Sequence, residues 1–342
     1  MRKNTRVNRK SAAILGALAL TLTLVGCSSS SSETQSQSLT VYSGRSEELI
    51  APFFEEFTEE SGIKVDIRYG DSAALAAQLL EEGANSPADL FLSQDAGSLG
   101  AVSAANLLAE LSSDVLNKVE SKYQSKNSDW VGVTGRTRVF VYSPERVTSL
   151  PKSIDELTQS QWRGKLGIAP TNSSFQAFIS ALIQSRGEAG AENWLNAIKA
   201  NEPKIYEKNS QIVEAVDGGE LDLGLVNHYY IWEVSSELGR PVKAKIDFFQ
   251  PGDLGNLINV SGAGVMETSK NKAGAEKLIS YLLSDATQQR FVSDTHEYSL
   301  VLPELKPEDL PALSEVKAPA VDLSTLADLQ KTQALLVKVG LI

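Results

Sequence analysis

The chain has 342 residues, a formal net charge of −11 at neutral pH and a single cysteine. The acidic balance argues against nucleic acid as a partner, because such binding depends on Lys and Arg side chains that neutralise phosphates. One cysteine excludes an internal disulfide and a thiolate cluster. The length is sufficient for two hydrophobic cores, so we expect two lobes.

Residues 1–26 have the pattern of a secretory leader. Five Lys or Arg residues near the start precede an apolar run, residues 12–25, that is too short for a stable membrane span. The run ends in Gly26-Cys27, which resembles a bacterial lipobox and predicts cleavage before a lipidated Cys27. Residues 27–38 are rich in Ser and are predicted to form a flexible tether. We therefore expect an extracytoplasmic protein, anchored to the cell membrane through Cys27 and on the periplasmic side if the cell has an outer membrane.

The first part of the mature chain alternates between strand and helix patterns. Strands are predicted over residues 39–42, 62–69 and 88–92. Helices are predicted to begin at Ser46 and Ser72, where apolar residues recur at helical spacing. This alternation predicts an α/β lobe with a mostly parallel sheet. Ligands of such sheets lie beyond the carboxyl ends of the strands, so the loops after these strands form the expected ligand edge.

A second α/β lobe is predicted from the middle of the chain. The strand at 138–142 is expected to cross between the lobes, and residues 259–266 are expected to form the returning strand. Helices are predicted over residues 154–162, 175–185, 191–200 and 323–339. The expected boundaries are residues 39–137 with 261–305 for one lobe and 138–260 with 306–342 for the other.

Small polar residues at 170–174 precede the apolar helix that is predicted from residue 175. The free N–H groups and the dipole of a helix N-terminus attract anions, so this segment is a candidate anion site. An ordinary helix cap by Ser or Asn is the alternative interpretation.

The segment with the most distinctive chemistry is Asn227-His228-Tyr229-Tyr230, which follows a short apolar strand pattern. Ionised phenols are hard, anionic oxygen ligands of the kind that a small trivalent cation favours. A phenol with a pKa near 10 loses its proton at neutral pH only beside a strong positive charge. The pair therefore suggests a ferric-ion site, and packing of both rings in the core is the alternative.

Motifs of catalysis are missing from the sequence. The only two histidines, His228 and His296, have neither the spacing of a metalloprotease nor a recognisable Ser/His/Asp order. There is no Walker motif and no Gly-rich dinucleotide turn, and no pair of carboxylates suggests general acid–base work. We therefore do not expect an enzyme, and we interpret His228 as a hydrogen-bonding or packing residue.

A secreted lipoprotein of two α/β lobes with crossing strands is typical of the solute-binding proteins of importers. Beyond this, the chain resembles the ferric-ion-binding proteins of bacterial ABC iron importers over nearly all of its mature length. The motifs that carry the resemblance are Val41-Tyr-Ser-Gly44, Ser86-Pro-Ala-Asp89, Ser103-Ala-Ala-Asn-Leu107, Gly135-Arg-Thr-Arg-Val139, Asn209-Ser210 and Asn227-His-Tyr-Tyr230.

The resemblance implies a two-lobed, type II periplasmic-binding-protein fold, with two mixed sheets flanked by helices and a ligand cleft between the lobes. It implies that Tyr229 and Tyr230 bind Fe3+ together with a synergistic anion, carbonate or phosphate. The residues that match the family's anion site are Asn172, Ser173, Ser174, Asn209 and Asn227. The implied partners are an ABC permease and its ATPase, and the protein is expected to act as a monomer.

Two arginines, Arg136 and Arg138, match the family's Gly-Arg-x-Arg run, whose charge either supports the cleft or forms structural pairs. An alternative reading keeps the fold and changes the ligand to an organic anion, a sugar phosphate or chelated iron. In that reading Arg45, Arg136 and Arg138 clamp the anionic group and the tyrosines stack on it.

Three positions depart from the family pattern. Some members supply a histidine, a glutamate or a third tyrosine where this chain has Ser46, Gln94 and Phe175. The implied protein ligands are then the two tyrosines alone, and the anion or water takes the remaining iron sites. Asp95 becomes a carboxylate ligand if the loop after the third strand is shifted by one residue from the alignment that places Gln94 there.

Overall fold

The computed structural model of the protein describes residues 38–323, 326 and 328–342. The predicted leader (1–26), the predicted lipidation site Cys27 and all of the predicted tether except Ser38 lie outside the described residues. Ser38 already belongs to the first strand, so the tether prediction extends one residue too far. Among the helices that the structure describes, none combines the length and the apolar character needed to cross a bilayer.

The described strands form one continuous mixed sheet of ten strands, in the order β2-β1-β3-β9-β4-β7-β5-β6, with β8 and β10 also pairing with β4. Their bounds are β1 (Ser38–Ser43), β2 (Lys64–Tyr69), β3 (Leu90–Ser93), β4 (Val131–Tyr142), β5 (Leu166–Ile168), β6 (Lys204–Ile205), β7 (Leu223–Asn227), β8 (Lys245–Asp247), β9 (Ile258–Val265) and β10 (Tyr298–Ser299).

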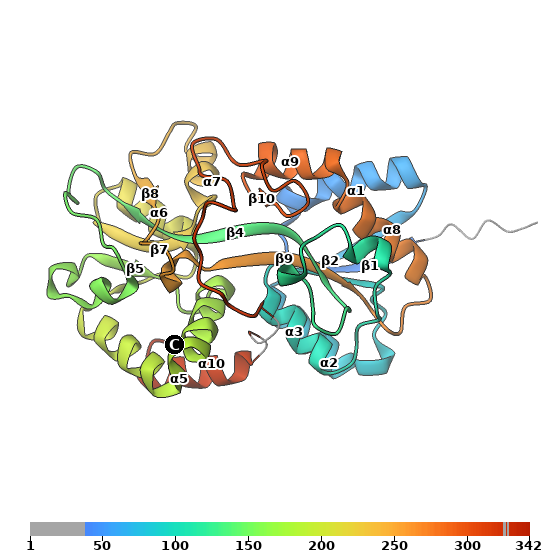
Figure 1. Cartoon of the computed structure of the whole chain (residues 1–342), viewed down its shortest axis with the longest axis horizontal. Helices are drawn as coiled ribbons and strands as arrows, with labels where there is room; N and C mark the ends of the chain where they lie inside the picture. Colours follow the sequence, from blue (N-terminus) through green and yellow to red (C-terminus); the bar gives the residue numbers. More distant parts are fainter. Residues whose placement is uncertain (1–37, 324–325, 327) are drawn as a thin grey trace, which may run out of the picture. The chain divides into compact units, whose positions relative to one another are not determined.

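Strand β4 belongs to both halves of this sheet. Up to Thr137 it pairs with β9, and from Arg138 onward it pairs with β7. Figure 1 shows β4 and β9 side by side between two groups of helices. The two predicted sheets are therefore joined through a shared strand, and the predicted strand at 138–142 is only the last part of β4.

The first half of the sheet is mixed, whereas the alternation of strands and helices predicted a mostly parallel sheet. Strand β1 is parallel to β2 and β3, but β9 returns from the second half and is antiparallel to β3 and β4. A returning strand so distant in sequence leaves no mark on the local pattern, which explains the difference.

Helices flank the sheet on both halves. The α-helices are α1 (Glu47–Ser61), α2 (Ser72–Glu82), α3 (Ala96–Ala104), α4 (Ser113–Leu116), α5 (Ser173–Ala200), α6 (Asn209–Asp217), α7 (Tyr230–Glu237), α8 (Lys272–Leu282), α9 (Asp285–Thr295) and α10 (Leu329–Val339). The 3-10 helices are η1 (Gly83–Asn85), η2 (Ser121–Tyr123), η3 (Ile154–Thr158), η4 (Ser160–Trp162) and η5 (Leu254–Asn256). In Figure 1, α1, α2, α3, α8 and α9 lie with β1–β3, and α5, α6, α7 and α10 lie with β5–β8.

Two predicted helices differ from the structure. The predicted helix at 154–162 is two 3-10 helices, because the backbone of Gln159 between them is extended. The helices predicted at 175–185 and 191–200 are confirmed as the two parts of α5, which begins at Ser173 and is interrupted at Gly187, whose φ of 71° and ψ of 167° suit only glycine. The last helix begins at Leu329, where Asp328 accepts a bond from the backbone N–H of Lys331 at 3.0 Å.

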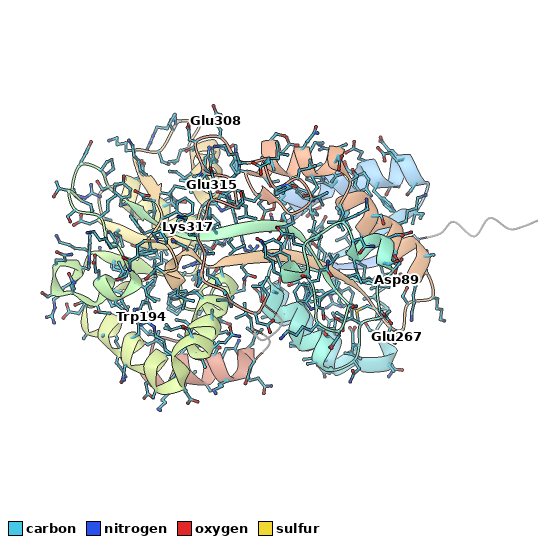
Figure 2. The ribbon with its side chains drawn as sticks, in the orientation of Figure 1. Asp89, Trp194, Glu267, Glu308, Glu315 and Lys317 are labelled. Carbon is cyan, nitrogen blue, oxygen red and sulfur yellow. The ribbon has the colours of Figure 1, made fainter. Side chains whose placement is uncertain are left out.

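Side-chain hydrogen bonds connect elements within each half of the sheet, and Figure 2 labels one such residue from each half, Asp89 and Trp194. Asp89 accepts a hydrogen bond from the Thr40 N–H at 2.8 Å and another from the Ser269 hydroxyl at 2.6 Å, which links β1 to the segment after β9. In the other half, the indole N–H of Trp194 donates to the Ile154 carbonyl at 3.0 Å, which holds α5 against η3.

Strand β7 leads into the tyrosine pair and packs tightly against α6. A Cβ atom added at Gly224 would lie 2.1 Å from Cγ2 of Ile212. We expect Gly224→Ala to lower the free energy of unfolding by about 1–3 kcal/mol, since overpacking forces neighbouring atoms to shift. Urea denaturation of the two proteins measures the difference.

The matched control is Ile212→Ala, which removes the obstructing methyl group. The double variant is expected to lose at least about 0.5 kcal/mol less than the two single losses together, because the clash is then relieved. Strictly additive losses would contradict this account of the contact.

Candidate metal-binding site

The two tyrosines lie where β7 ends and α7 begins. Asn227 is the last residue of β7, opposite Arg138 of β4, and α7 starts at Tyr230. Tyr229 is 4% exposed and Tyr230 is 9% exposed, and their ring centroids are 4.4 Å apart. The pair is therefore buried at a strand end, but each ring keeps its phenol edge near polar groups.

One of these polar groups comes from the opposite half of the sheet. Gln94 follows β3, and its side-chain N–H donates to the phenol oxygen of Tyr229 at 3.3 Å. The predicted alternative, Asp95, lies 1% exposed at the start of α3, and its two oxygens accept bonds from the Ser98 N–H and hydroxyl at 2.8 and 3.0 Å. Asp95 thus caps a helix, and Gln94 is the residue of this loop that contacts the tyrosines.

The predicted anion residues form one connected network. Asn172 caps α5, and its side-chain oxygen Oδ1 accepts from the Ser174 N–H at 3.0 Å and from the Asn209 side-chain amide at 3.1 Å. The Asn227 amide donates to the Ser174 hydroxyl at 3.0 Å. Ser173, the first residue of α5, is 5% exposed. The helix cap, one of the two interpretations that the sequence left open, is therefore present at Asn172, and the predicted anion residues lie around it.

Arg138 completes this network. One guanidinium nitrogen donates to the side-chain oxygens of Asn209 and Asn227 at 3.5 and 3.3 Å, and Nη2 has no hydrogen-bond partner among the described residues. Burial lowers the pKa of Arg138 to about 10, so the group remains charged at neutral pH. A buried cation with a free N–H donor favours a nearby anion.

Arg136 has even fewer hydrogen-bond partners than Arg138. It is 1% exposed, and within the described chain none of its three guanidinium nitrogens has a hydrogen-bond partner. Its neighbour across the strands is Asn259 of β9, whose amide nitrogen is also without a partner. Unpaired buried donors are costly, so an anionic ligand fits these residues.

The organic-anion reading requires Arg45 to bind an anionic ligand, but in the structure Arg45 is paired with a carboxylate of the protein. It forms a two-point ion pair with Glu297, at 3.0 and 2.9 Å, and the two residues are 4% and 1% exposed. The pair joins the loop after β1 to the segment between α9 and β10. Arg45 is thus engaged, and Glu297, isolated in a distant part of the sequence, gave no local signal of its importance.

His228 is completely buried and has a fixed tautomer. Its Nδ1 accepts a hydrogen bond from the Thr137 N–H at 3.2 Å, so Nε2 carries the proton and donates to the His296 carbonyl at 2.7 Å. Its ring stands edge-on to Tyr229, with centroids 5.6 Å apart. Burial lowers the pKa of His228 to about 4. The expected packing and hydrogen-bonding role is confirmed, and the bonds tie the tyrosine turn to β4 and to the end of α9.

The other two departures from the resemblance have plain structural roles. Ser46 is exposed and precedes α1, and Phe175 is 1% exposed with its ring 5.9 Å from that of Phe178. Moreover, no three His, Asp or Glu side chains in the described ranges come together as a metal site.

Tyr230 is held neutral by its surroundings. Burial, together with the neighbouring phenol of Tyr229 and the carboxylate of Glu233, raises the pKa of Tyr230 well above its ordinary value of 10. This phenol would therefore release its proton only to a strongly charged cation.

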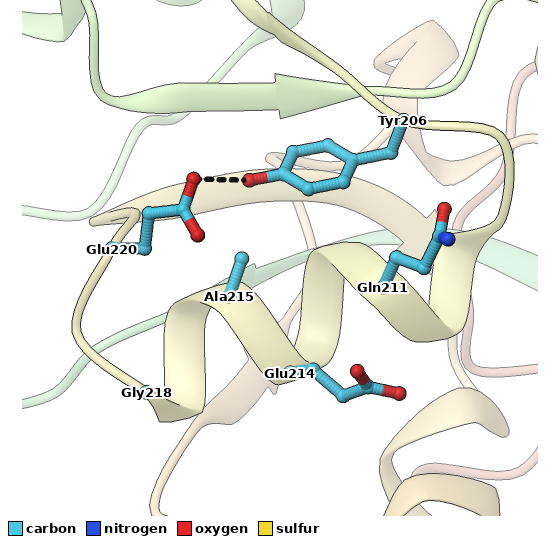
Figure 3. Close-up of a pocket in the computed structure, with 6 residues that line it drawn as sticks. All are labelled: Tyr206, Gln211, Glu214, Ala215, Gly218 and Glu220. Atoms are coloured by element: carbon cyan, nitrogen blue, oxygen red, sulfur yellow. Dashed lines mark hydrogen bonds between the residues drawn. The ribbon is translucent and has the colours of Figure 1, made fainter.

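A surface hollow of about 370 Å3 beside α6 contains a further tyrosine, but none of the predicted site residues lines it. Figure 3 shows the Tyr206 hydroxyl directed at Glu220, to which it donates a hydrogen bond at 3.0 Å. Burial and this bond raise the pKa of Tyr206 to about 12, so this phenol is held neutral.

Comparison with known sequences identifies relatives over most of the chain. The sequence model of the family described as bacterial extracellular solute-binding protein matches residues 85–323. The chain is 34% identical over 308 residues to the major ferric iron-binding protein of Neisseria meningitidis serogroup A, covering 89% of this chain and 93% of that protein. It is 32% identical to the Fe(3+)-binding periplasmic protein of Serratia marcescens, covering 89% of this chain and 90% of that protein.

Solved structures of iron-binding proteins are similar to this chain in fold over most of its length. Iron-bound HitA from Pseudomonas aeruginosa superposes with a TM-score of 0.84 at 33% identity, covering 89% of this chain and 99% of that chain. The Trichodesmium protein IdiA (FutA), in complex with iron and citrate, superposes with a TM-score of 0.75 at 28% identity, covering 89% and 99%. The predicted two-lobed α/β fold is thereby confirmed.

The buried histidine predicts a specific loss of stability in acid. Between pH 6.5 and about 4 the unfolded chain protonates His228 and the folded protein does not, so the free energy of unfolding falls as the pH falls. The full contribution is about 3 kcal/mol. Chemical denaturation from pH 7.5 to 4 is expected to show this extra slope in the wild type and to show it lost in His228→Gln.

The control is His296→Gln, which changes the only other histidine and leaves its backbone carbonyl in place. This variant is expected to retain most of the slope. Equal slopes for the wild type and His228→Gln would contradict the assigned role of His228.

Proposed function

The chain belongs to the family of bacterial extracellular solute-binding proteins, and we propose that its solute is ferric iron, bound at Tyr229 and Tyr230 together with an anion. The observation that carries this proposal is the placement of two buried phenols beside a network of amide donors and two incompletely paired arginines. The relatives and solved structures whose names include ferric or bound iron support the same ligand.

The proposed site selects its metal by charge and by ligand type. Ferric iron displaces the phenol protons, and the two phenolates that form are hard donors for a hard trivalent ion. Because Tyr230 resists ionisation in the absence of a cation, a weakly charged metal would bind poorly. Binding is therefore expected to release protons and to weaken in acid.

The anion is proposed to lie between the iron and the start of α5. Asn172, Ser173, Ser174, Asn209 and Asn227 are the proposed anion residues. The N–H groups at the start of α5 and the guanidinium groups of Arg136 and Arg138 supply donors and positive charge, which suit carbonate or phosphate. The anion then neutralises the arginines and also coordinates the iron.

Both halves of the sheet contribute to the proposed site. We propose lobes at residues 39–137 with 261–305 and 138–260 with 306–342, because β4 changes partner between Thr137 and Arg138. Capture would then be a closure that brings Gln94 against Tyr229, as the 3.3 Å contact between them suggests.

The biological role that we propose is transport and not catalysis. In this role a monomer, anchored to the outer face of the cell membrane through lipidated Cys27, delivers iron to an ABC permease and its ATPase. The name of the Serratia marcescens relative, a periplasmic protein, supports an extracytoplasmic location. Metabolic labelling with a fatty-acid analogue, lost in Cys27→Ser, tests the anchor.

The central prediction concerns colour. Ferric salt with carbonate or phosphate is expected to give a visible phenolate-to-iron charge-transfer absorption. The absorption is expected to disappear in Tyr229→Phe/Tyr230→Phe, with an affinity loss of at least about 100-fold, or about 2.7 kcal/mol. The control is Tyr69→Phe, at a half-buried tyrosine of β2, which should leave the spectrum unchanged.

A charge-transfer absorption that persists in the double variant would refute the assignment.

The same preparation also tests the alternative ligands. A thermal-shift series with ferric carbonate, ferric citrate and sugar phosphates is expected to show the largest stabilisation with iron present, because a ligand stabilises the state that binds it. Stabilisation by a sugar phosphate without iron would favour the organic-anion reading.

A further inference from the structure

One carboxylate beside the tyrosines has no role in the site described so far. Glu233 lies on α7, three residues after Tyr230 and four after Tyr229. Its backbone N–H donates to the Tyr229 carbonyl at 3.2 Å, so Glu233 stands one helical turn above the pair. Side chains at this spacing share one face of a helix, and they lean toward its N-terminus, where the tyrosines lie.

The side chain of Glu233 lacks a polar partner of its own. In the part of the chain that the structure describes, it forms neither a hydrogen bond nor an ion pair. Five charged or titratable groups influence it: Glu237 of the same helix, Arg45, Lys208, Glu297 and the phenol of Tyr230. Of the two cations in this group, Arg45 already binds both oxygens of Glu297. The carboxylate is thus available to a ligand.

The carboxylate of Glu233 interacts electrostatically with the phenol of Tyr230 and with the carboxylate of Glu237 on the same helix. A trivalent ion between the carboxylate and the phenol oxygens would attract both groups, because carboxylate and phenolate are hard, anionic oxygen ligands.

The iron site proposed above has two phenolates and an anion as its ligands, and a hard trivalent ion favours further oxygen donors. Gln94 is neutral, Asp95 caps α3 and Phe175 packs in the core, so none of these positions supplies a free carboxylate. Glu233 lies on α7, the helix that begins at Tyr230, so its carboxylate would approach such an ion from the same helix as the tyrosine.

We propose that Glu233 is a third protein ligand to the iron. Its carboxylate then joins the phenolates of Tyr229 and Tyr230, so that all three protein ligands come from residues 229–233. This inference rests on the proposed function, because it adds a ligand to the same iron site. On binding, one Fe–O bond forms and any proton on the carboxylate passes to solvent.

The test compares Glu233→Gln with Glu237→Gln in the mature protein. Both variants remove one negative charge from an exposed residue of α7, but only the first removes the proposed ligand. The affinity for ferric iron is measured by competition with a chelator in carbonate buffer, with the charge-transfer band as the signal. Thermal melts without iron check that both variants fold.

We expect Glu233→Gln to bind iron at least about tenfold more weakly, since even outer-shell partners of metal ligands contribute on this scale. Its band is also expected to move to longer wavelength, because an ion that loses an anionic ligand accepts an electron from phenolate more easily. Glu237→Gln is expected to keep the wild-type affinity and band.

Two results would overturn the inference. One is a Glu233→Gln protein with wild-type affinity and band position. The other is an equal weakening in both variants with an unmoved band, which would indicate a long-range effect of charge and no direct bond. Failure of the proposed function is distinguishable from both, because the wild type itself would then give no band with ferric iron.

Discussion

The polar groups around the tyrosine pair surround two buried guanidinium groups that lie on one strand. Arg136 and Arg138 lie on the same face of β4, at the point where the strand exchanges β9 for β7, and both are almost fully buried. Among the described residues neither has a carboxylate bonded to it, and the removal of a cation from water without such a partner is expensive. The surrounding amides and the N-terminus of α5 offer further N–H donors, so this part of the fold favours negative charge.

The site unites segments that are far apart in the sequence, and β4 is the reason that this is possible. The strand places Arg138 opposite Asn227, and thereby brings the end of β7 to the anion network. Through β9 it also places Asn259 opposite Arg136. A single extended segment that pairs with both halves can align two loop clusters without a separate linking element.

Residues in recognisable local patterns were predictable from the sequence, whereas those defined by distant partners were not. The tyrosine pair follows an apolar strand, and the Asn172–Ser174 segment precedes an apolar helix, so a short window reveals both. Glu297 is important only because Arg45 folds against it, 252 positions away along the chain. For the same reason the local pattern alone predicted a mostly parallel sheet, because β9 returns from the other half, and the mixed sheets were implied only by the resemblance. Gln94 and Asp95 differ by one position, and only the helix cap distinguishes their roles.

The histidine before the tyrosines is bonded on both sides by main-chain groups, the Thr137 N–H and the His296 carbonyl. Almost every amino acid offers these groups, so the bonds depend on the path of the backbone and hardly at all on which side chains occupy the two positions. During divergence, residues 137 and 296 could therefore change while the histidine stays. A search for covarying pairs would find no partner for His228, even though it makes two well-defined contacts.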